Sequence, residues 1–270
     1  MPDTSDTPTP AATAATTPTL ALPGGAIPVL GLGTWQSEGS DAELAVSAAL
    51  QLGYRHVDTA TGYGNEAQVG RALATCGIDR DDVFVTTKLP PDHADRARQT
   101  LMESLAALGT DHLDLWLIHW PPGGQARPDV WDELRRARDE GHVRSIGVSN
   151  YSIAQIDELI AATGEAPAVN QIPYSPVDHD AALLAAHRER GVVVEGYSPL
   201  KRTDLTAEPI AAAARAHGVT PAQVVLRWHV EHDVVVIPKS VRRERIEENL
   251  AVLGFALTPD EVAAIDTLGG

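Results

Sequence analysis

Residues 113–149 read LDLWLIHWPPGGQARPDVWDELRRARDEGHVRSIGVS, and they contain the unit from which most of the chain is built. An apolar run at 113–119 is followed by a segment of helical period at 129–141 and by a second apolar run at 143–149. Short runs of aliphatic residues are typical of strands buried in a parallel sheet. The stretch therefore predicts a strand, a helix and a second strand.

The same alternation continues in both directions along the chain. The apolar runs are VLGLGT at 29–34, YRHVDT at 54–59, VFVTTK at 83–88, LDLWLIH at 113–119, VRSIGVS at 143–149, PAVNQI at 167–172, VVVEGYS at 192–198 and VVVIPKS at 234–240. Eight strand–helix units in about 250 residues predict an α/β fold, the (β/α)8 or TIM barrel. A doubly wound sheet is rejected, because Gly31-Leu-Gly33-Thr-Trp-Gln36 lacks the third glycine of its phosphate-binding fingerprint.

Two features precede the first run. LALPGGAIPV at 20–29 predicts an N-terminal β-hairpin with Gly24-Gly25 at its turn, placed to close the bottom of the barrel. Thr, Pro and Ala dominate the residues before it, so we expect a disordered tail over 1–18 and a single catalytic barrel domain over 19–270.

Composition limits the classes of protein that remain. The 270 residues carry a formal net charge of −16, which argues against general binding to nucleic acid. Cys76 is the only cysteine, so no intrachain disulfide can form, and a reducing cytoplasmic location fits. The first nineteen residues hold no Lys, no Arg and no apolar run, so we expect no signal peptide. We expect no membrane span, and a monomer is the default expectation.

Polar side chains stand where the predicted strands end, which is where barrels of this kind collect their chemistry. In chain order they are Asp58, Tyr63 in the following loop, Lys88, His119, Ser149-Asn150, Gln171, Tyr197-Ser198 and Lys239-Ser240. Taken singly, Asp58 could cap a helix, Lys88 could form a surface ion pair and His119 could be a core histidine. Packing alone does not explain all of them together, so we interpret them as one catalytic site.

The Tyr–Lys–Asp–His group suits proton transfer to a carbonyl or from an alcohol. A free phenol has a pKa of ~10, and we expect a nearby ammonium to lower it. An aspartate can hold the lysine in place, and a histidine can orient the substrate oxygen. These groups cannot supply a hydride, so a reduction would require a nicotinamide cofactor.

Six stretches then make the chain resemble the aldo-keto reductases, and the resemblance runs from about residue 20 to about residue 268. They are GYRHVDTATGYGNE, LDLWLIHWPP, VRSIGVSNYS, VNQIPYSP, GYSPL and VIPKSVRRERIEENL. Within the family, the chain is similar to bacterial members with a short C-terminus, of the diketogluconate reductase-like kind. The resemblance implies a (β/α)8 barrel and a catalytic tetrad of Asp58, Tyr63, Lys88 and His119, with Tyr63 as general acid.

The resemblance also implies NADPH/NADP+ as the cofactor. Ser149, Asn150 and Gln171 correspond to residues that hold the nicotinamide carboxamide, and Tyr197 corresponds to the aromatic that stacks on its ring. Other implied cofactor contacts are Thr34, Trp35, Ser198, Leu200 and Val241, with Glu248 and Asn249 at the adenine.

The segment KSVRRER at 239–245 supports this cofactor on physical grounds. It holds four cations and one anion in an acidic chain, and it opens a predicted helix. A helix N-terminus with nearby cations is an anion site, and a solvated basic patch is the alternative. By the resemblance, Lys239, Ser240 and Arg245 contact the 2′-phosphate, so NADPH is expected ahead of NADH.

The substrate is expected to be a small carbonyl compound. Trp35, Tyr63, His119 and Trp120 correspond to the substrate pocket of the family. Lys88 is followed by LPPD, where many relatives place another aromatic, and Pro173 replaces the Glu of the common pattern. The chain stops at LGG where other members carry a longer loop over the pocket, which implies an open site.

Three other readings remain open at this point. His56 and Asp58 share a face of one strand and could hold zinc together with His119. No second closely spaced His pair occurs at a strand end, so we expect no metal ion there. His56 is then expected to face the barrel interior. Lys88 could instead form a Schiff base as a lyase does. The barrel could also bind NADPH and report redox state to a partner without turnover.

Overall fold

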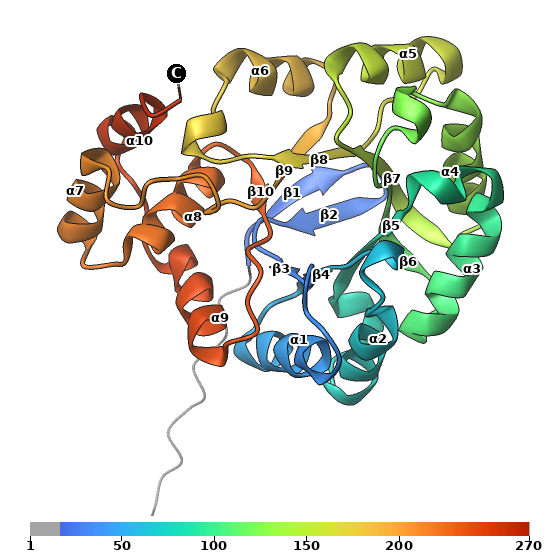
Figure 1. Cartoon of the computed structure of the whole chain (residues 1–270), viewed down its shortest axis with the longest axis horizontal. Helices are drawn as coiled ribbons and strands as arrows, with labels where there is room; N and C mark the ends of the chain where they lie inside the picture. The colour runs from blue at the N-terminus through green and yellow to red at the C-terminus, as the bar shows by residue number, and fades with distance from the viewer. Residues whose placement is uncertain (1–16, 270) are drawn as a thin grey trace, which may run out of the picture.

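An eight-stranded parallel sheet forms the centre of the computed structural model, which describes residues 17–269 (Figure 1). Hydrogen-bonded neighbours follow one another in chain order from β3 to β10. The parallel bridges Leu30–Val236 and Gly33–Lys239 join the two edges, so the sheet closes on itself and the expected (β/α)8 barrel is confirmed. The strands are β3 Leu32–Gly33, β4 His56–Asp58, β5 Phe84–Leu89, β6 Leu113–Ile118, β7 Val143–Ser149, β8 Val169–Pro173, β9 Val193–Tyr197 and β10 Val235–Val236.

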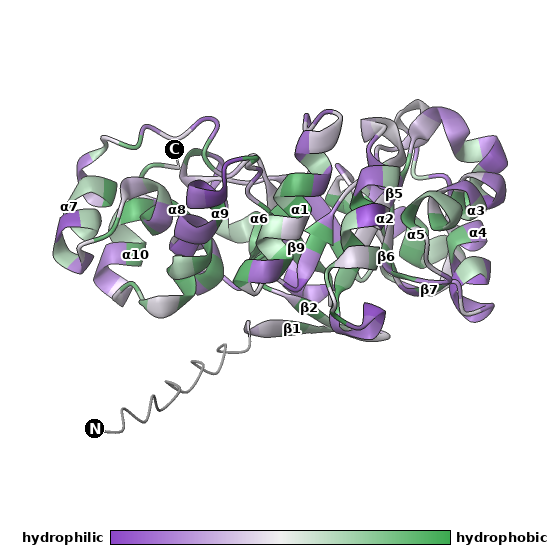
Figure 2. Ribbon diagram, turned by 90° about the horizontal axis from the view of Figure 1, so that it is seen from below, coloured by the Kyte–Doolittle hydropathy of each residue, from purple (hydrophilic) through white to green (hydrophobic). Residues whose placement is uncertain are grey.

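Helices cover the outside of the sheet, and their apolar sides face the strands while charged residues face outward (Figure 2). Gly53 and Gly109 end their helices in the left-handed conformation that glycine adopts without strain. The helices are α1 Ser40–Leu52, α2 Glu66–Thr75, α3 Ala97–Leu108, α4 Pro128–Asp139, α5 Ile153–Thr163, α6 Ala181–Glu189, α7 Glu208–His217, α8 Pro221–Glu231, α9 Arg243–Leu250 and α10 Pro259–Asp266.

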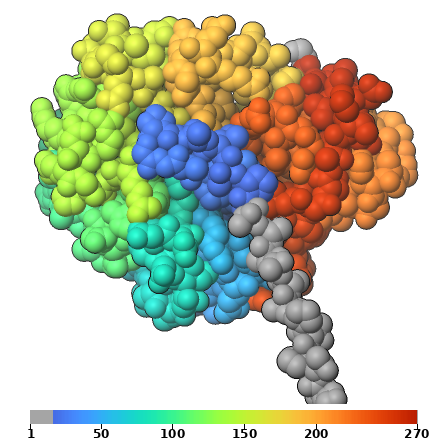
Figure 3. Space-filling model, turned by 180° about the vertical axis from the view of Figure 1, so that it is seen from behind, coloured from blue at the N-terminus to red at the C-terminus, as the bar shows by residue number. Residues whose placement is uncertain are grey.

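The N-terminal hairpin lies across the end of the barrel where the strands begin (Figure 3). It pairs β1 Thr19–Leu22 with β2 Gly25–Pro28. Its turn is Pro23-Gly24, one residue earlier than the expected Gly24-Gly25, because Gly25 already pairs with Leu22. Ile27 is fully buried against the strand ends, so the hairpin closes the bottom as expected.

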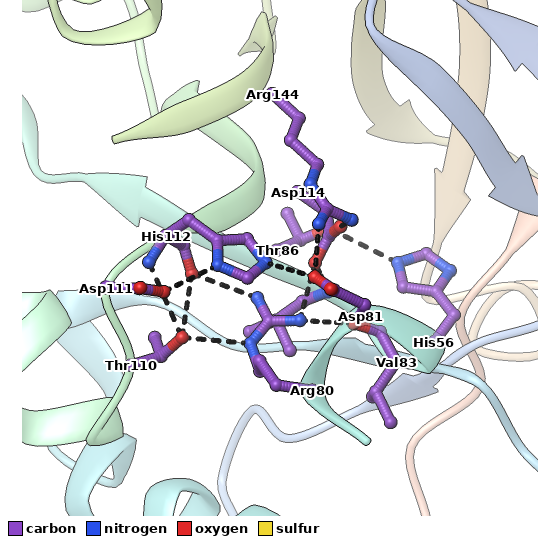
Figure 4. A network of polar contacts seen from close by, with 11 residues as sticks. His56, Arg80, Asp81, Val83, Thr86, Thr110, Asp111, His112, Asp114 and Arg144 are labelled. Atoms are coloured by element: carbon purple, nitrogen blue, oxygen red, sulfur yellow. Dashed lines mark hydrogen bonds and ion pairs between the residues drawn. The ribbon is translucent and has the colours of Figure 1, made fainter. Parts of the chain in front are cut away.

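Ion pairs hold the connections together at this same end (Figure 4). The carboxylate of Asp114 in β6 binds Arg80 at 2.9 Å and Arg144 at 3.0 Å. Arg80 also donates to the backbone carbonyl of His112 at 3.0 Å. These charged side chains at the bottom of the barrel are therefore paired with one another.

The last strand is shorter than the run at 234–240 predicts. Only Val235–Val236 form a regular ladder, because Pro238 has no N–H to donate, and pairing resumes only at the bridge to Lys239. The tail expected over 1–18 lies outside the described residues, except for Thr17 and Pro18. None of the helices within residues 17–269 is both long and apolar enough to cross a membrane.

Candidate active site

The four residues of the predicted tetrad come from three neighbouring strands and the loops after them. Asp58 ends β4, and Tyr63 ends the 3₁₀ turn Thr61–Tyr63 that follows it. Lys88 is the fifth residue of β5, and His119 directly follows β6. Because the strands are parallel, all four lie at the same end of the barrel.

The Lys88 ammonium is the centre of this group. It donates to Asp58 Oδ1 at 2.6 Å, to the backbone oxygen of Thr59 at 2.7 Å and to Tyr63 Oη at 3.5 Å. These three acceptors use all three of its N–H donors. The Lys88 side chain has no exposed surface, so its position depends entirely on these partners.

Burial and ion pairing shift the pKa values of Asp58 and Lys88 in opposite directions. Burial by itself lowers the pKa of the Lys88 ammonium, but the charge and hydrogen bond of Asp58 raise it above its usual value. Burial raises the pKa of Asp58, while Lys88 and a hydrogen bond from Gln171 at 2.8 Å act against that rise. The direct contact at 2.6 Å favours the ion pair, with Lys88 charged.

Tyr63 departs from the expectation based on charge alone. Burial raises the pKa of its phenol above the usual value of 10.0, and Lys88 offsets only part of this rise. The expected lowering by the ammonium is present, but the loss of hydration around a phenolate outweighs one cation at 3.5 Å, so the pKa is raised overall. The phenol is protonated at neutral pH, which is the form that a proton donor needs.

His119 is a neutral group beside the phenol. Burial, with a contribution from the Lys88 charge, lowers its pKa to about 3. Its ring meets the ring of Tyr63 edge to face, with the centroids 5.6 Å apart. A neutral imidazole can donate or accept a hydrogen bond at neutral pH, but it cannot serve as the proton source there.

Tyr63 and His119 both open into a cavity of about 400 Å³ at this end of the barrel. Asn150, which has a positive φ of 63°, links the tetrad to the opposite wall of the cavity. Its side-chain amide group donates to the His119 carbonyl at 3.1 Å, and its amide oxygen accepts from Tyr197 Oη at 2.8 Å. Many of the site residues predicted from the sequence line this cavity. They are Trp35, Asp58, Tyr63, His119, Trp120, Ser149, Asn150, Gln171, Tyr197, Ser198 and Lys239.

The other predicted residues lie beside the cavity or at α9. Thr34 is buried and donates to the Asp58 carbonyl at 3.0 Å, and Leu200 packs against the core. The Glu248 carboxylate accepts a hydrogen bond from Thr220 at 2.6 Å, which already engages one of its oxygens within the protein. Arg245 and Asn249 lie with Glu248 in α9, and Ser240 and Val241 directly precede this helix.

Arg245 is unusual among the arginines of residues 17–269. Every other arginine in this range has a side-chain hydrogen bond or ion pair. Within the same range, no such partner is found for Arg245 or for the exposed Lys239. Two uncompensated cations near a helix N-terminus indicate a place for an anion.

The structure adds residues that the sequence did not assign. Gly33, Gly62, Pro199, Lys201 and Ile237 also line the cavity. The Lys201 ammonium lies 5.8 Å from the ring centroid of Trp35. The position of Lys201 just beyond a strand end was the available signal, because the two other lysines of the chain stand in similar places.

Glu195 is a second buried carboxyl group close to the tetrad, and the sequence analysis did not assign it to the site. Gln171 Nε2 donates both to Asp58 Oδ2 and to Glu195 Oε2, at 2.8 Å each. Burial raises the pKa of Glu195 to about 8, helped by the negative charge of Asp58. Glu195 sits in the middle of the apolar run at 192–198, so its sequence position suggested only a strand residue facing the barrel interior.

Comparison with known proteins agrees with this geometry. Residues 29–269 match the model of the "Aldo/keto reductase family". An aldo-keto reductase from Mycolicibacterium smegmatis is 44% identical over 249 residues, which cover 91% of this chain and 90% of the relative. An aldo/keto reductase from Brucella melitensis has a crystal structure with a TM-score of 0.89 and 40% identity, covering 94% of this chain and 100% of that one.

A second similar structure is that of an aldo-keto reductase from Bombyx mori in complex with NADP. Its TM-score is 0.88 and its identity 34%, and the match covers 95% of this chain and 94% of that one. The chain belongs to the aldo-keto reductase family. It is thereby an NADP-dependent oxidoreductase that acts on carbonyl groups.

Proposed function

We propose that the chain reduces small aldehydes and ketones to alcohols, with Tyr63 donating a proton to the carbonyl oxygen. The observation that carries this proposal is the contact chain from Asp58 through Lys88 to Tyr63, at 2.6 Å and 3.5 Å, ending at an open cavity. A protonated phenol held over a cation can give up its proton and leave a phenolate stabilised by that cation.

Each member of the tetrad has a separate part in this proposal. Tyr63 transfers the proton, and Lys88 stabilises the phenolate that remains. Asp58 and the Thr59 carbonyl keep Lys88 in position. The neutral His119 ring orients the carbonyl oxygen by a hydrogen bond, because its pKa of about 3 excludes a charged role at neutral pH.

The residues around the cavity fit a nicotinamide ring and its carboxamide. When bound, NADPH supplies the hydride that the side chains cannot. Gln171 donates from its Nε2 to the carboxyl groups of Asp58 and Glu195, which leaves its carbonyl oxygen as the acceptor for a carboxamide N–H. Tyr197 presents a ring on the cavity wall, fixed through its hydroxyl to Asn150.

The start of α9 fits the phosphate at the other end of the cofactor. Arg245 and Lys239 are exposed and have no charged partner within residues 17–269, and the helix N-terminus adds backbone N–H groups. Val241 is 38% exposed between them, an apolar side chain suited to the adenosine. We infer that this cluster selects NADPH over NADH.

Two indole rings favour small substrates with an apolar part. Trp35 and Trp120 are 46% and 49% exposed, and both line the cavity. Exposed tryptophans at a cavity mouth provide apolar surface that a bound molecule can cover. A panel of aldehydes, ketones and diketones, assayed by NADPH oxidation, identifies the substrate class.

Replacement of Tyr63 tests the proposed proton donor. Tyr63→Phe should leave NADPH binding intact and lower turnover of the best aldehyde by ~10²–10⁴-fold, the usual contribution of general acid catalysis. Tyr151→Phe is the matched control, since the Tyr151 hydroxyl is buried against the Ala126 carbonyl, away from the tetrad. A Tyr63→Phe enzyme with kcat within a few-fold of the parent, when chemistry limits the rate, refutes the assignment.

The same assays separate the other two readings. A redox-reporting barrel would bind NADPH without turning over any carbonyl compound of the panel. A Schiff-base lyase would form an adduct that borohydride traps without NADPH, but it needs a free amine, and the buried Lys88 ammonium is held by three acceptors. We therefore expect no trapped adduct on Lys88.

A further inference from the structure

Three side chains from distant parts of the chain meet away from the catalytic cavity. His179 lies in the connection from β8 to α6, His232 follows α8, and Asp266 is the last residue of α10. One nitrogen or oxygen atom of each lies within 4.8 Å of the corresponding atoms of the other two. Within residues 17–269, no other group of three His, Cys, Asp or Glu residues is gathered in this way.

We propose that His179, His232 and Asp266 form a binding site for one divalent transition-metal ion such as Zn²⁺. His232 Nε2 is 2.8 Å from Asp266 Oδ1, and His179 Nε2 is 3.8 Å from Asp266 Oδ2. A tetrahedral Zn²⁺ with bonds of about 2.0–2.1 Å places its ligand atoms roughly 3.3 Å apart. The two observed distances, one to each oxygen of the Asp266 carboxylate, lie on either side of this value, so the side chains are near the spacing that one ion requires.

Outer hydrogen bonds direct the ligand atoms inward. Tyr174 Oη lies 2.7 Å from His179 Nδ1, so the hydrogen bond at this nitrogen leaves Nε2 for the metal. Trp228 Nε1 donates to Asp266 Oδ1 at 2.7 Å and orients the carboxylate. Metal-binding histidines and carboxylates regularly have such partners, which fix the ring and the charge in place.

The surroundings suit a cation that enters from solvent. His179, His232 and Asp266 are 9%, 16% and 28% exposed, so an ion can reach them and still lose most of its water. Arg188 is a cation beside His232, and its guanidinium already has partners. It donates to the His232 carbonyl at 2.7 Å and lies 3.6 Å from the Asp233 carboxylate.

A second contact between a histidine and a carboxylate of α10 lacks the features of the His179–His232–Asp266 cluster. His217 contacts Glu261 of α10 at 3.0 Å, but no third ligand joins this pair among the described residues. Two ligands at the surface hold a metal weakly, whereas three with outer partners make a complete face of a coordination sphere. The His217–Glu261 pair therefore serves as an internal control.

Zinc binding to untagged, chelator-treated full-length protein tests the site, measured by competition with a chromogenic chelator. The parent should bind one Zn²⁺, and His217→Gln should bind it with the same affinity. His179→Gln, His232→Gln and Asp266→Asn should each lower the affinity for Zn²⁺ by at least ~100-fold, which is more than the loss of an outer partner costs. Tyr174→Phe removes only the outer hydrogen bond and should weaken binding by ~10–100-fold.

Cobalt gives a second readout, because the visible spectrum of bound Co²⁺ reports on the coordination of the metal. Co²⁺ bound to the parent should show the intense visible bands of a four-coordinate site, and Zn²⁺ should raise the unfolding temperature of the parent and of His217→Gln. A parent that binds no Zn²⁺ more tightly than the Asp266→Asn variant overturns the proposal. So does an equal loss in His217→Gln, which would indicate scattered surface histidines.

Discussion

Tyr63 shows how burial and charge compete at one atom. The sequence places a lysine beside the phenol and so suggests a lowered pKa, whereas the structure shows that burial wins and the pKa rises. The lysine still lowers the pKa of the phenol relative to a site without it. In the mechanism we propose, Lys88 therefore matters most in the direction that requires a phenolate, which is alcohol oxidation.

Replacement of Lys88 should move the pH dependence of alcohol oxidation upward. Lys88→Met removes the cation that favours the phenolate, so the Tyr63 pKa rises further and the rate at neutral pH falls strongly. The measurement is kcat for oxidation of the best alcohol as a function of pH.

The control for this change is the double variant Asp58→Asn/Lys88→Met, since Lys88→Met alone leaves a buried carboxylate without its partner. The same upward movement in both variants ties the effect to the phenol. An unchanged profile at a near-normal rate would mean that Lys88 does not act on Tyr63.

Arg245 should determine the choice of cofactor. A hydrogen bond to a charged group contributes ~1.5–3 kcal/mol, or ~10–150-fold in affinity, and NADH lacks the 2′-phosphate that would accept it. Arg245→Ala should weaken NADPH by about that factor and leave NADH nearly unchanged. Quenching of protein fluorescence during titration with each cofactor gives both dissociation constants.

Arg243→Ala is the matched control for this prediction. It removes the same charge from the same helix, but the Arg243 guanidinium donates to Gln51 at 3.1 Å. Equal loss of NADPH and NADH in Arg245→Ala would assign the residue to folding or to the adenine. A parent without preference for NADPH would refute the role proposed for the whole cluster at 239–245.

The hairpin β1–β2 depends on one backbone conformation. Gly24 has a φ of +92°, and a Cβ there would lie 2.1 Å from the Arg144 carbonyl of β7. The turn is also held by Ser145, whose hydroxyl donates to the Pro23 carbonyl at 2.6 Å. The turn thus touches β7 closely enough to require glycine at one position only.

Gly24→Ala should therefore destabilise the protein, whereas Gly25→Ala should not. Strain at a positive φ costs of order 1–3 kcal/mol, and the clash with Arg144 adds to it. A Cβ at Gly25 would meet no atom within 4 Å, and the φ of Gly25 is not positive. Urea unfolding of both variants measures the difference, and equal stability would contradict a tight contact between hairpin and barrel.

The barrel interior as a whole buries two titratable groups in their neutral forms. Burial lowers the pKa of His56 to about 3 and raises that of Glu195 to about 8. For Glu195, the folded state holds its proton more firmly than the unfolded state does. Its contribution to stability is complete below pH 4.5, its ordinary pKa, and is lost as the pH rises toward 8.

Glu195→Gln should make the free energy of unfolding depend less on pH in this range. A single proton released on unfolding gives a slope of at most about 1.4 kcal/mol per pH unit, so the parent should lose stability between pH 5 and 8 faster than the variant does. Urea unfolding at a series of pH values measures it, with the surface replacement Glu43→Gln as control. Parallel curves for parent and Glu195→Gln would show that Glu195 is not protonated in the folded protein.

Local pattern was sufficient for most of the fold and for placing the residues of the predicted tetrad at one end of the barrel. Aliphatic runs separated by amphipathic segments predicted every strand of the barrel to within a few residues, because burial on both faces of a parallel sheet leaves a continuous apolar run. Asp58, Lys88 and His119 could be placed together since parallel strands bring their ends to one side. The ladder of β10 was overestimated because an apolar run does not show where Pro238 interrupts the hydrogen bonds.

Only the tertiary structure could reveal desolvation and long-range contacts, because both depend on residues far apart in sequence. The pKa of Tyr63 depends on how much water the surrounding strands exclude, which no local pattern encodes. Gln171 joins Asp58 to Glu195 across the barrel, and the run around Glu195 reads simply as a strand. The cluster of His179, His232 and Asp266 forms only because the β8–α6 connection, α8 and α10 pack together, so no spacing in the sequence predicts it.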